Sequence, residues 1–181
     1  MQIAEPIPEA LNHDIERWSA ALRDAGASSA QLQQAQMAAR IVAHLTLDTE
    51  VTGGVLLHEA AVELEQVRAA FSVASRSVAD QLTRLGEFGG NMRWEESVTP
   101  RGSQAEILRR MLLAVVSDPR LIVARLAIQL ARLRVARDHT EHDRLQLAHE
   151  SRAVFAPLAH RLGVWQIKWE LEDLAFRYLE P

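Results

Sequence analysis

The residues best able to do chemistry in this chain are its histidines and carboxylates, because it contains no cysteine. Disulfides, thiolate catalysis and cysteine-bound zinc are therefore excluded. His58 and Glu59 stand side by side and begin the pattern of a zinc protease, but that motif needs a second histidine where this chain has Val62. A hydrogen-bonded structural histidine is the simpler interpretation of His58.

Two other groups of polar residues are closely spaced. His139 and His142 lie in the charged stretch RDHTEHDR, which could attract a metal but is typical of the solvated start of a helix. Glu170, Glu172 and Asp173 put acidic charge on a predicted C-terminal helix, where a solvated face explains most of it. We interpret both groups as exposed charge.

Helical periodicity runs through most of the chain and must position these residues. A shorter helical stretch is predicted at about 67–85. Another helix is predicted to begin near Thr140 and to be interrupted by Pro157. Trp165 and Trp169 share one helical face and are expected to pack inward. Residues 86–102 hold four glycines and one proline, which predicts a flexible loop. Capping residues precede the apolar runs at Ser28 or Ser29, Asp48 and Thr49, Ser103, and Asp118.

The composition favours one globular domain of the all-α class. Apolar residues make up 48% of the 181, enough for a substantial core, and no alternating strand pattern occurs. The net charge of −4 gives no electrostatic footprint for nucleic acid. No apolar run approaches the roughly 18 residues of a membrane span, and the acidic N-terminus is unlike a signal peptide. We therefore expect a cytoplasmic protein without a membrane partner.

Two segments carry a resemblance to a known family. The segment AVFAPLAHRLGVWQIKWELEDLAFRYLEP, at 153–181, resembles YAPLANRLG…KWELEDLxFRYLxP, and EILRRMLLAVVSDPRLIVARLA, at 106–127, resembles ENLRKMLLAMxxDxRVxxIKLA. With LLHE at 56–59 and IVAHLTLD at 41–48, the likeness covers about residues 30 to 181. Both patterns are those of RelA/SpoT homologues, whose N-terminal all-helical HD-type domain hydrolyses (p)ppGpp.

The resemblance implies a division of the chain. Residues 1–28 would form an N-terminal helix and lead-in, and 29–178 a hydrolase-like, pseudo-HD domain with the flexible loop at 86–102. Residues 179–181 would start the linker to a synthetase domain, whose catalytic residues lie outside this chain.

The resemblance also locates the metal site of active relatives, where two histidines and two aspartates hold a divalent cation, usually Mn²⁺. That cation activates water to attack the 3′-pyrophosphate. The four positions are Gln34, His58, Glu59 and Ile128 here. An amide is a weak ligand, an isoleucine is none, and Glu59 is one methylene longer than aspartate. We expect no bound metal and no other cofactor.

The remaining site positions depart from the family as well. The catalytic Glu-Asp couple becomes Val62 and Glu63, and the nucleotide-contacting asparagine and threonine become Arg132 and Val135. Apolar residues such as Ile128 are expected to fill the former polar cleft. The pattern resembles RelA-type synthetases of proteobacteria, whose HD site is degenerate.

The function implied is that of a catalytically inactive regulatory domain of a GTP pyrophosphokinase in the stringent response. It would bias the adjoining synthetase domain by contacting its two states differently. Ribosome and tRNA contacts would belong to C-terminal domains outside this chain. Two alternatives stay open: a metal-dependent (p)ppGpp phosphohydrolase with a rearranged site using His58, Glu59 and Glu63, and a self-association module that forms a homo-oligomer.

Overall fold

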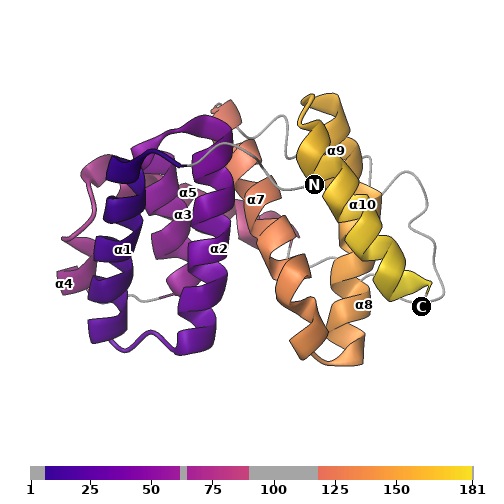
Figure 1. The fold of residues 1–181 in the computed structure, drawn as a ribbon, viewed down its shortest axis with the longest axis horizontal. Helices are drawn as coiled ribbons and strands as arrows, with labels where there is room; N and C mark the ends of the chain where they lie inside the picture. The colour runs from indigo at the N-terminus through magenta and orange to yellow at the C-terminus, as the bar shows by residue number, and fades with distance from the viewer. Residues whose placement is uncertain (1–6, 62–64, 90–117, 181) are drawn as a thin grey trace.

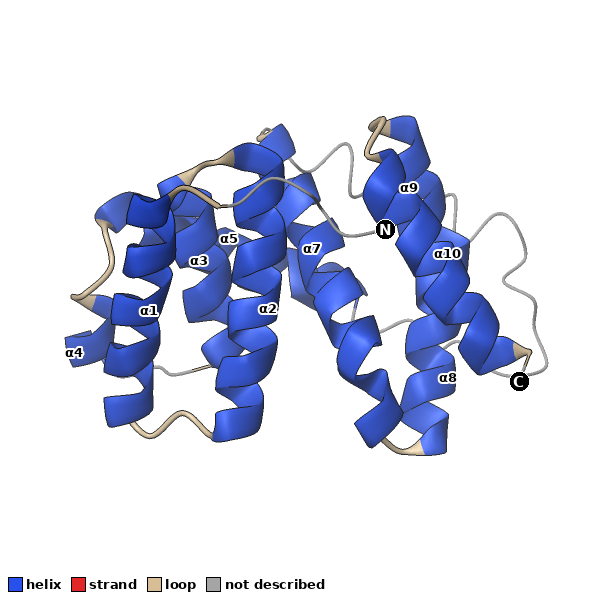
Figure 2. Cartoon of the chain, in the orientation of Figure 1, coloured by secondary structure: helices blue, strands red, loops and turns tan. Residues whose placement is uncertain are grey.

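The computed structural model describes residues 7–61, 65–89 and 118–180, and the regular structure within them is helical throughout (Figures 1 and 2). The predicted all-α class is confirmed. None of the described helices is long and apolar enough to cross a membrane. In chain order the helices are α1 (Glu9–Asp24), α2 (Ser29–Thr46), α3 (Thr49–Ala60), α4 (Glu65–Arg68), α5 (Val73–Gly89), α7 (Pro119–Val135), α8 (Glu141–Glu150), α9 (Ala156–Arg161) and α10 (Trp165–Leu179).

Side chains that accept hydrogen bonds from free backbone N–H groups fix the predicted helix starts. Ser28 and Gln31 form a reciprocal capping box at the start of α2. Asp48 accepts two backbone N–H groups of α3, at 2.9 and 3.0 Å. Asp118 caps α7, which begins with Pro119. The predicted cap at Ser103 lies outside the described residues.

Arg120 ties the starts of α3 and α7 together. Its guanidinium donates to Asp48 Oδ2 and to Asp118 Oδ2, each at 2.7 Å. Burial opposes the ionisation of Asp48, but hydrogen bonds from the Val51 amide and from Arg120 outweigh it and lower its pKa. The hydrogen bond from Arg120 also lowers the pKa of Asp118. This ionised junction sets the relative position of two helices that carry candidate site residues.

Helix α7 is the centre of the domain. Figure 1 shows α1 to α5 gathered on one side of it and α8 to α10 on the other. α2 packs against both α3 and α7, α3 packs against α5, and α10 packs against α8 and α9. The larger core runs along α7 from Leu121 to Leu133, and a second core surrounds the stacked rings of Trp18 and Phe71. Both cores leave the inner faces of α2, α3 and α7 next to one another.

Three predicted boundaries were wrong. The single segment at 67–85 breaks at 69–72, where the Ser72 hydroxyl accepts the Ser75 N–H and starts a new helix. That helix, α5, continues to Gly89, so 86–89 are helical instead of loop, because buried Leu82 and Leu85 anchor the last turns. The rest of the predicted 86–102 loop lies outside the described residues.

The interruption near Pro157 also begins earlier than predicted. Residues Ser151–Phe155 form a wider π-type turn before α9. Proline has no N–H and its ring collides with the carbonyl four residues before it, so the wider turn accommodates it. Gly163 follows the end of α9 with φ of 74°, a left-handed conformation that favours glycine.

Candidate functional site

Helices α2, α3 and α7 bring Gln34, Glu59 and Arg132 into direct contact. Gln34 Nε2 donates to Glu59 Oε2 at 2.8 Å. Arg132 donates from Nη2 to Glu59 Oε1 at 2.7 Å and from Nε to Oε2 at 3.2 Å. The Glu59 side chain is only 1% exposed. A buried carboxylate needs compensation for lost hydration, and here an arginine and an amide supply it.

His58 borders this contact from α3. Its Nδ1 lies 3.1 Å from Thr83 Oγ1, and that hydroxyl donates to the Ala79 carbonyl. Because the Thr83 hydroxyl donates its own proton to Ala79, it can only accept a hydrogen bond from His58. The His58 Nδ1 is therefore the protonated ring nitrogen. Burial lowers the pKa of His58, and Arg125 and Arg132 lower it further against the opposing effect of Glu59. The imidazole is therefore neutral near pH 7.

One face of α7 supplies the chemistry around Glu59. Arg125, Ile128, Gln129 and Arg132 are spaced by three or four residues, so they lie on the same face. Ile128 is fully buried and belongs to the larger core. This face therefore presents two cations, an amide and an aliphatic group, and no carboxylate.

Arg125 adds a buried arginine to the half-buried Arg132 on the same helix. It is 9% exposed, and within the described part of the chain its Nε has no hydrogen-bond partner. Burial and the like charge of Arg132 lower the pKa of Arg125, while Glu150 and Glu59 act in the opposite direction. Burial raises the pKa of Glu150, which accepts a hydrogen bond from Gln129 at 3.3 Å. We call Glu59, Arg125, Arg132 and Glu150 the polar cluster.

Comparison with known proteins identifies the family. A model described as an HD domain matches residues 16–165. The chain belongs to the HD domain family. It is 40% identical over 120 residues, 66% of its length, to a probable guanosine-3′,5′-bis(diphosphate) 3′-pyrophosphohydrolase of Synechocystis, and 33% identical over 144 residues, 77% of its length, to one of Aquifex aeolicus. It is also 51% identical over 78 residues, 43% of its length, to the GTP pyrophosphokinase of Escherichia coli.

These matches confirm an HD domain of the RelA/SpoT family, which includes proteins named as hydrolases and proteins named as GTP pyrophosphokinases. The chain spans 15%, 19% and 10% of the length of these three relatives. It therefore resembles one domain of proteins that are several times longer.

At the positions where the resemblance places metal ligands, the side chains are engaged by other groups of the protein or are apolar. Both oxygens of Glu59 already accept hydrogen bonds, and the Gln34 amide turns its NH₂ group toward them. Ile128 offers no lone pair. Within residues 7–61, 65–89 and 118–180, no three histidine or acidic side chains come together in a way that could hold a metal ion.

The other predicted positions do not join this contact. Val62 and Glu63 lie outside the described residues. Val135 ends α7, half-buried, with no polar group to add. His139 and His142 are exposed at the start of α8, as expected for a solvated helix end.

Arg132 has a larger role than its sequence position predicts. The resemblance described in the sequence analysis implies only that Arg132 replaces a nucleotide-contacting asparagine. In the structure, Arg132 donates hydrogen bonds to Glu59. One signal was available, because Arg132 follows Ile128 by four residues and so lies on the same face of α7. Arg125 and Glu150 were not predicted, and their approach depends on how α7 and α8 pack.

Proposed function

We propose that this HD domain is a non-catalytic regulatory domain of a (p)ppGpp synthetase of the GTP pyrophosphokinase kind. The observation that carries the proposal is the contact of Arg132 with Glu59. In an active HD site a metal ion neutralises the carboxylates, whereas here a side chain of the protein does so.

The charge of the polar cluster supports this proposal. The cluster holds as many arginines as glutamates, so it has no excess of acidic groups to attract a cation. A divalent ion about 4 Å from the Glu59 carboxylate would be attracted by about 8 kcal/mol at an effective dielectric constant of about 20, and the Arg132 guanidinium beside that carboxylate cancels an energy of this size. That is about the whole binding free energy of a micromolar ligand. The neutral His58 imidazole supplies one lone pair and no negative charge, so it does not replace that attraction.

The regulatory part of the proposal rests on what the domain retains. The capped helix starts at Asp48 and Asp118 and the continuous core along α7 hold the scaffold together without metal chemistry. One relative is named a GTP pyrophosphokinase, and the chain covers 10% of it. A folded domain without hydrolase chemistry can still change a neighbour's activity if it contacts two states of that neighbour unequally.

The test uses a polypeptide in which this domain is followed by the proposed synthetase domain, which we call the longer protein. It compares (p)ppGpp synthesis from ATP and GTP by the longer protein with and without this domain. We expect removal of the domain to change the synthesis rate several-fold and to leave (p)ppGpp breakdown absent in both forms. Equal synthesis rates would rule out regulation, and breakdown that depends on the domain would rule out the non-catalytic assignment.

A further inference from the structure

Helix α10 presents three different faces. Its buried face packs against the core through Ile167, Leu171 and Ala175. Trp165 and Trp169 are 50% and 62% exposed, so the prediction that these two residues pack inward was wrong. On a third face, the half-buried side chains of Glu170 and Leu174 line a groove between α10, α7 and α2.

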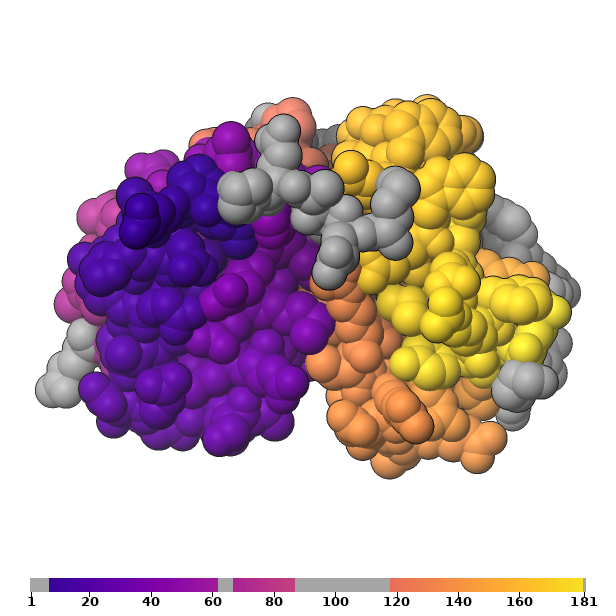
Figure 3. Space-filling model, in the orientation of Figure 1, coloured from indigo at the N-terminus to yellow at the C-terminus, as the bar shows by residue number. Residues whose placement is uncertain are grey.

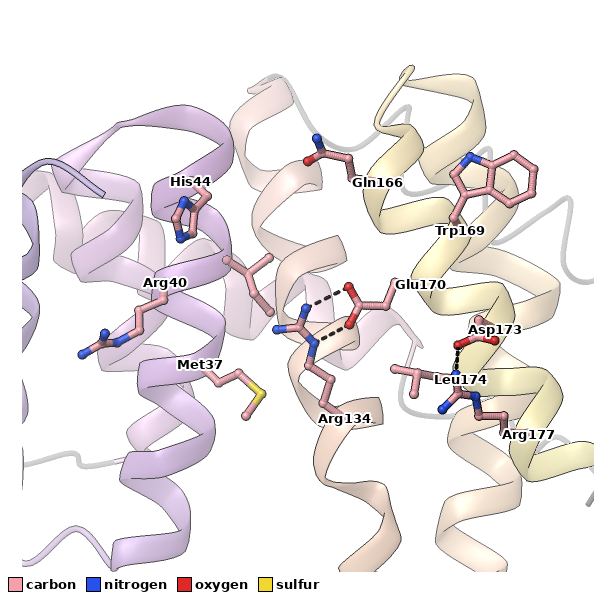
Figure 4. Close-up of a pocket in the computed structure, with 11 residues that line it drawn as sticks. Met37, Arg40, His44, Arg134, Gln166, Trp169, Glu170, Asp173, Leu174 and Arg177 are labelled. Atoms are coloured by element: carbon pink, nitrogen blue, oxygen red, sulfur yellow. Dashed lines mark hydrogen bonds and ion pairs between the residues drawn. The ribbon is translucent and has the colours of Figure 1, made fainter. Parts of the chain in front are cut away.

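The groove lies between the two halves of the domain that α7 joins. Its volume is about 690 Å³, which is within the range of sites for small organic molecules. Figure 3 shows α2 and α10 on either side of it. In Figure 4 the side chains of Met37 and Leu174 point toward Arg134 of α7 from opposite walls. Ile41 adds to the apolar lining, so both walls offer apolar surface to a bound molecule.

Arg134 brings an incompletely used guanidinium to this groove. Its Nε and Nη2 donate to the two oxygens of Glu170, at 2.6 and 2.8 Å. Glu170 was expected to be exposed charge, but its side chain is only 31% exposed. The third nitrogen, Nη1, makes no hydrogen bond within the described part of the chain, and Figure 4 shows it turned toward α2. It therefore offers two N–H donors to a ligand.

Two further polar side chains line the groove. His44 on α2 and Gln166 on α10 make no hydrogen bond to any of the residues that the structure describes. Each of them can donate or accept one. Together with Arg134, they place available polar groups from three helices around an apolar lining. A few polar groups on a mostly apolar surface are the usual composition of a small-molecule site.

The remaining arginines of the groove are directed elsewhere. In Figure 4 Arg40 points away from the groove, and it pairs with Glu16. Arg177 pairs with Asp173 on its own helix. A molecule between α2 and α10 thus meets one guanidinium whose donors are turned toward it. Hydrogen bonds between ionised partners are short and strong, so a single carboxylate or sulfonate suits this position. A polyphosphate would place several negative charges near Glu170 with one arginine to neutralise them.

We propose that this groove binds a small organic acid with an apolar body and one carboxylate or sulfonate group. The acid group accepts from Arg134 Nη1, and the body covers Met37, Ile41 and Leu174. Because α2 and α10 form opposite walls, the bound molecule stabilises one relative position of the two halves of the domain. This inference goes beyond the function proposed above and does not rest on it.

Two fluorescent probes test the proposal on the 181-residue chain. Anilinonaphthalene sulfonate carries an acid group on an aromatic body, and phenylnaphthylamine has the same body without the acid. We expect the sulfonate probe to bind one molecule per chain. Decanoate, a carboxylate with an aliphatic body, should displace it, whereas GTP should not. Displacement by GTP but not by decanoate overturns the proposed class of ligand.

A neutral double variant isolates the contribution of the guanidinium. Arg134→Gln combined with Glu170→Gln removes the cation and its partner together. It should weaken binding of the sulfonate probe about tenfold, the size expected for a hydrogen bond to a charged group, and leave phenylnaphthylamine unaffected. Arg152→Gln with Glu180→Gln is the matched control, because it removes an exposed ion pair outside the groove and should alter neither probe. Equal affinity of the sulfonate probe for the unchanged chain and both double variants overturns the proposal.

A second variant tests the apolar body of the ligand. Met37→Trp places a larger side chain in the groove and should abolish binding of both probes. If either probe binds this variant as it binds the unchanged chain, it sits on another apolar surface and the proposal fails. The neutral double variant keeps the test independent of this substitution, since Arg134 and Glu170 are both 31% exposed and their replacement leaves the core intact.

Discussion

Replacing Arg132 with methionine tests whether this guanidinium compensates the buried charge of Glu59. Methionine keeps much of the aliphatic length but cannot donate to a carboxylate that is 1% exposed. Removing one partner of a buried ion pair costs about 3–5 kcal/mol. The Arg132 side chain is 36% exposed, which admits water and favours the lower end, about 3 kcal/mol. For a chain of this size that lowers Tm by roughly 6–12 °C.

Arg134→Met is a matched control on the same helix. Arg134 makes an equally close bidentate contact with Glu170, but both side chains are 31% exposed. Pairs that water reaches contribute about 0–1 kcal/mol, so this variant should lose far less. Thermal and urea unfolding followed by circular dichroism measure both.

The double variant Arg132→Met with Glu59→Gln distinguishes charge compensation from simple packing. A neutral amide at position 59 no longer needs a cation, so the second change should recover most of the stability lost by the first. The reasoning is refuted if Arg132→Met is no less stable than Arg134→Met, or if the double variant is no more stable than Arg132→Met alone.

Three further substitutions follow from other contacts, each measured by the free energy of unfolding or by Tm. Asp48→Ala removes the α3 cap and the contact with Arg120, and should cost about 1–2 kcal/mol in urea at pH 7. Because folding lowers the pKa of Asp48, this carboxylate stabilises the fold above about pH 4, and the stabilisation is lost as the pH falls through the pKa of the folded state. If the stability difference between Asp48→Ala and the unchanged protein stays constant down to about pH 3, the ionised carboxylate is not its cause. Gly54→Ala puts a Cβ 2.4 Å from Val78 Cγ1 and should destabilise by about 1–3 kcal/mol, although alanine is the better helix former, and a gain in stability would be contrary to the packing. Ile128→Asp should lower Tm more than Ile128→Ala in differential scanning fluorimetry, and a return of Tm on adding Mn²⁺ would show that the site still accepts metal.

The helices were predictable where a capping residue and an apolar stripe coincide. Asp48 and Asp118 begin α3 and α7 as expected, because a cap acts within its own few residues. The break before α5 and the π-type turn before α9 were not predicted. At Ser72, the side-chain hydroxyl accepts a backbone N–H and so starts a new helix where the helical pattern would otherwise continue. At Pro157, the ring would collide with the carbonyl four residues earlier, and the helix widens before it.

The sequence predicts which metal-ligand positions are changed, but it does not predict the contact of Arg132 with Glu59. Gln34 and Ile128 could be recognised as poor ligands from their side-chain chemistry alone. That Arg132 reaches Glu59 depends on the spacing between α3 and α7, which no local pattern encodes. The same limit explains the error at Trp169, since four-residue spacing shows that residues share a face but not whether that face turns inward.

The most direct test of the non-catalytic assignment is a pair of measurements on the 181-residue chain, with an active relative from the hydrolase group as positive control. Isothermal titration with Mn²⁺ should give no heat of binding, and incubation with ppGpp and Mn²⁺ should release no pyrophosphate above the blank. The Arg132–Glu59 contact predicts both results. Stoichiometric Mn²⁺ binding accompanied by pyrophosphate release that a chelator abolishes would contradict the account.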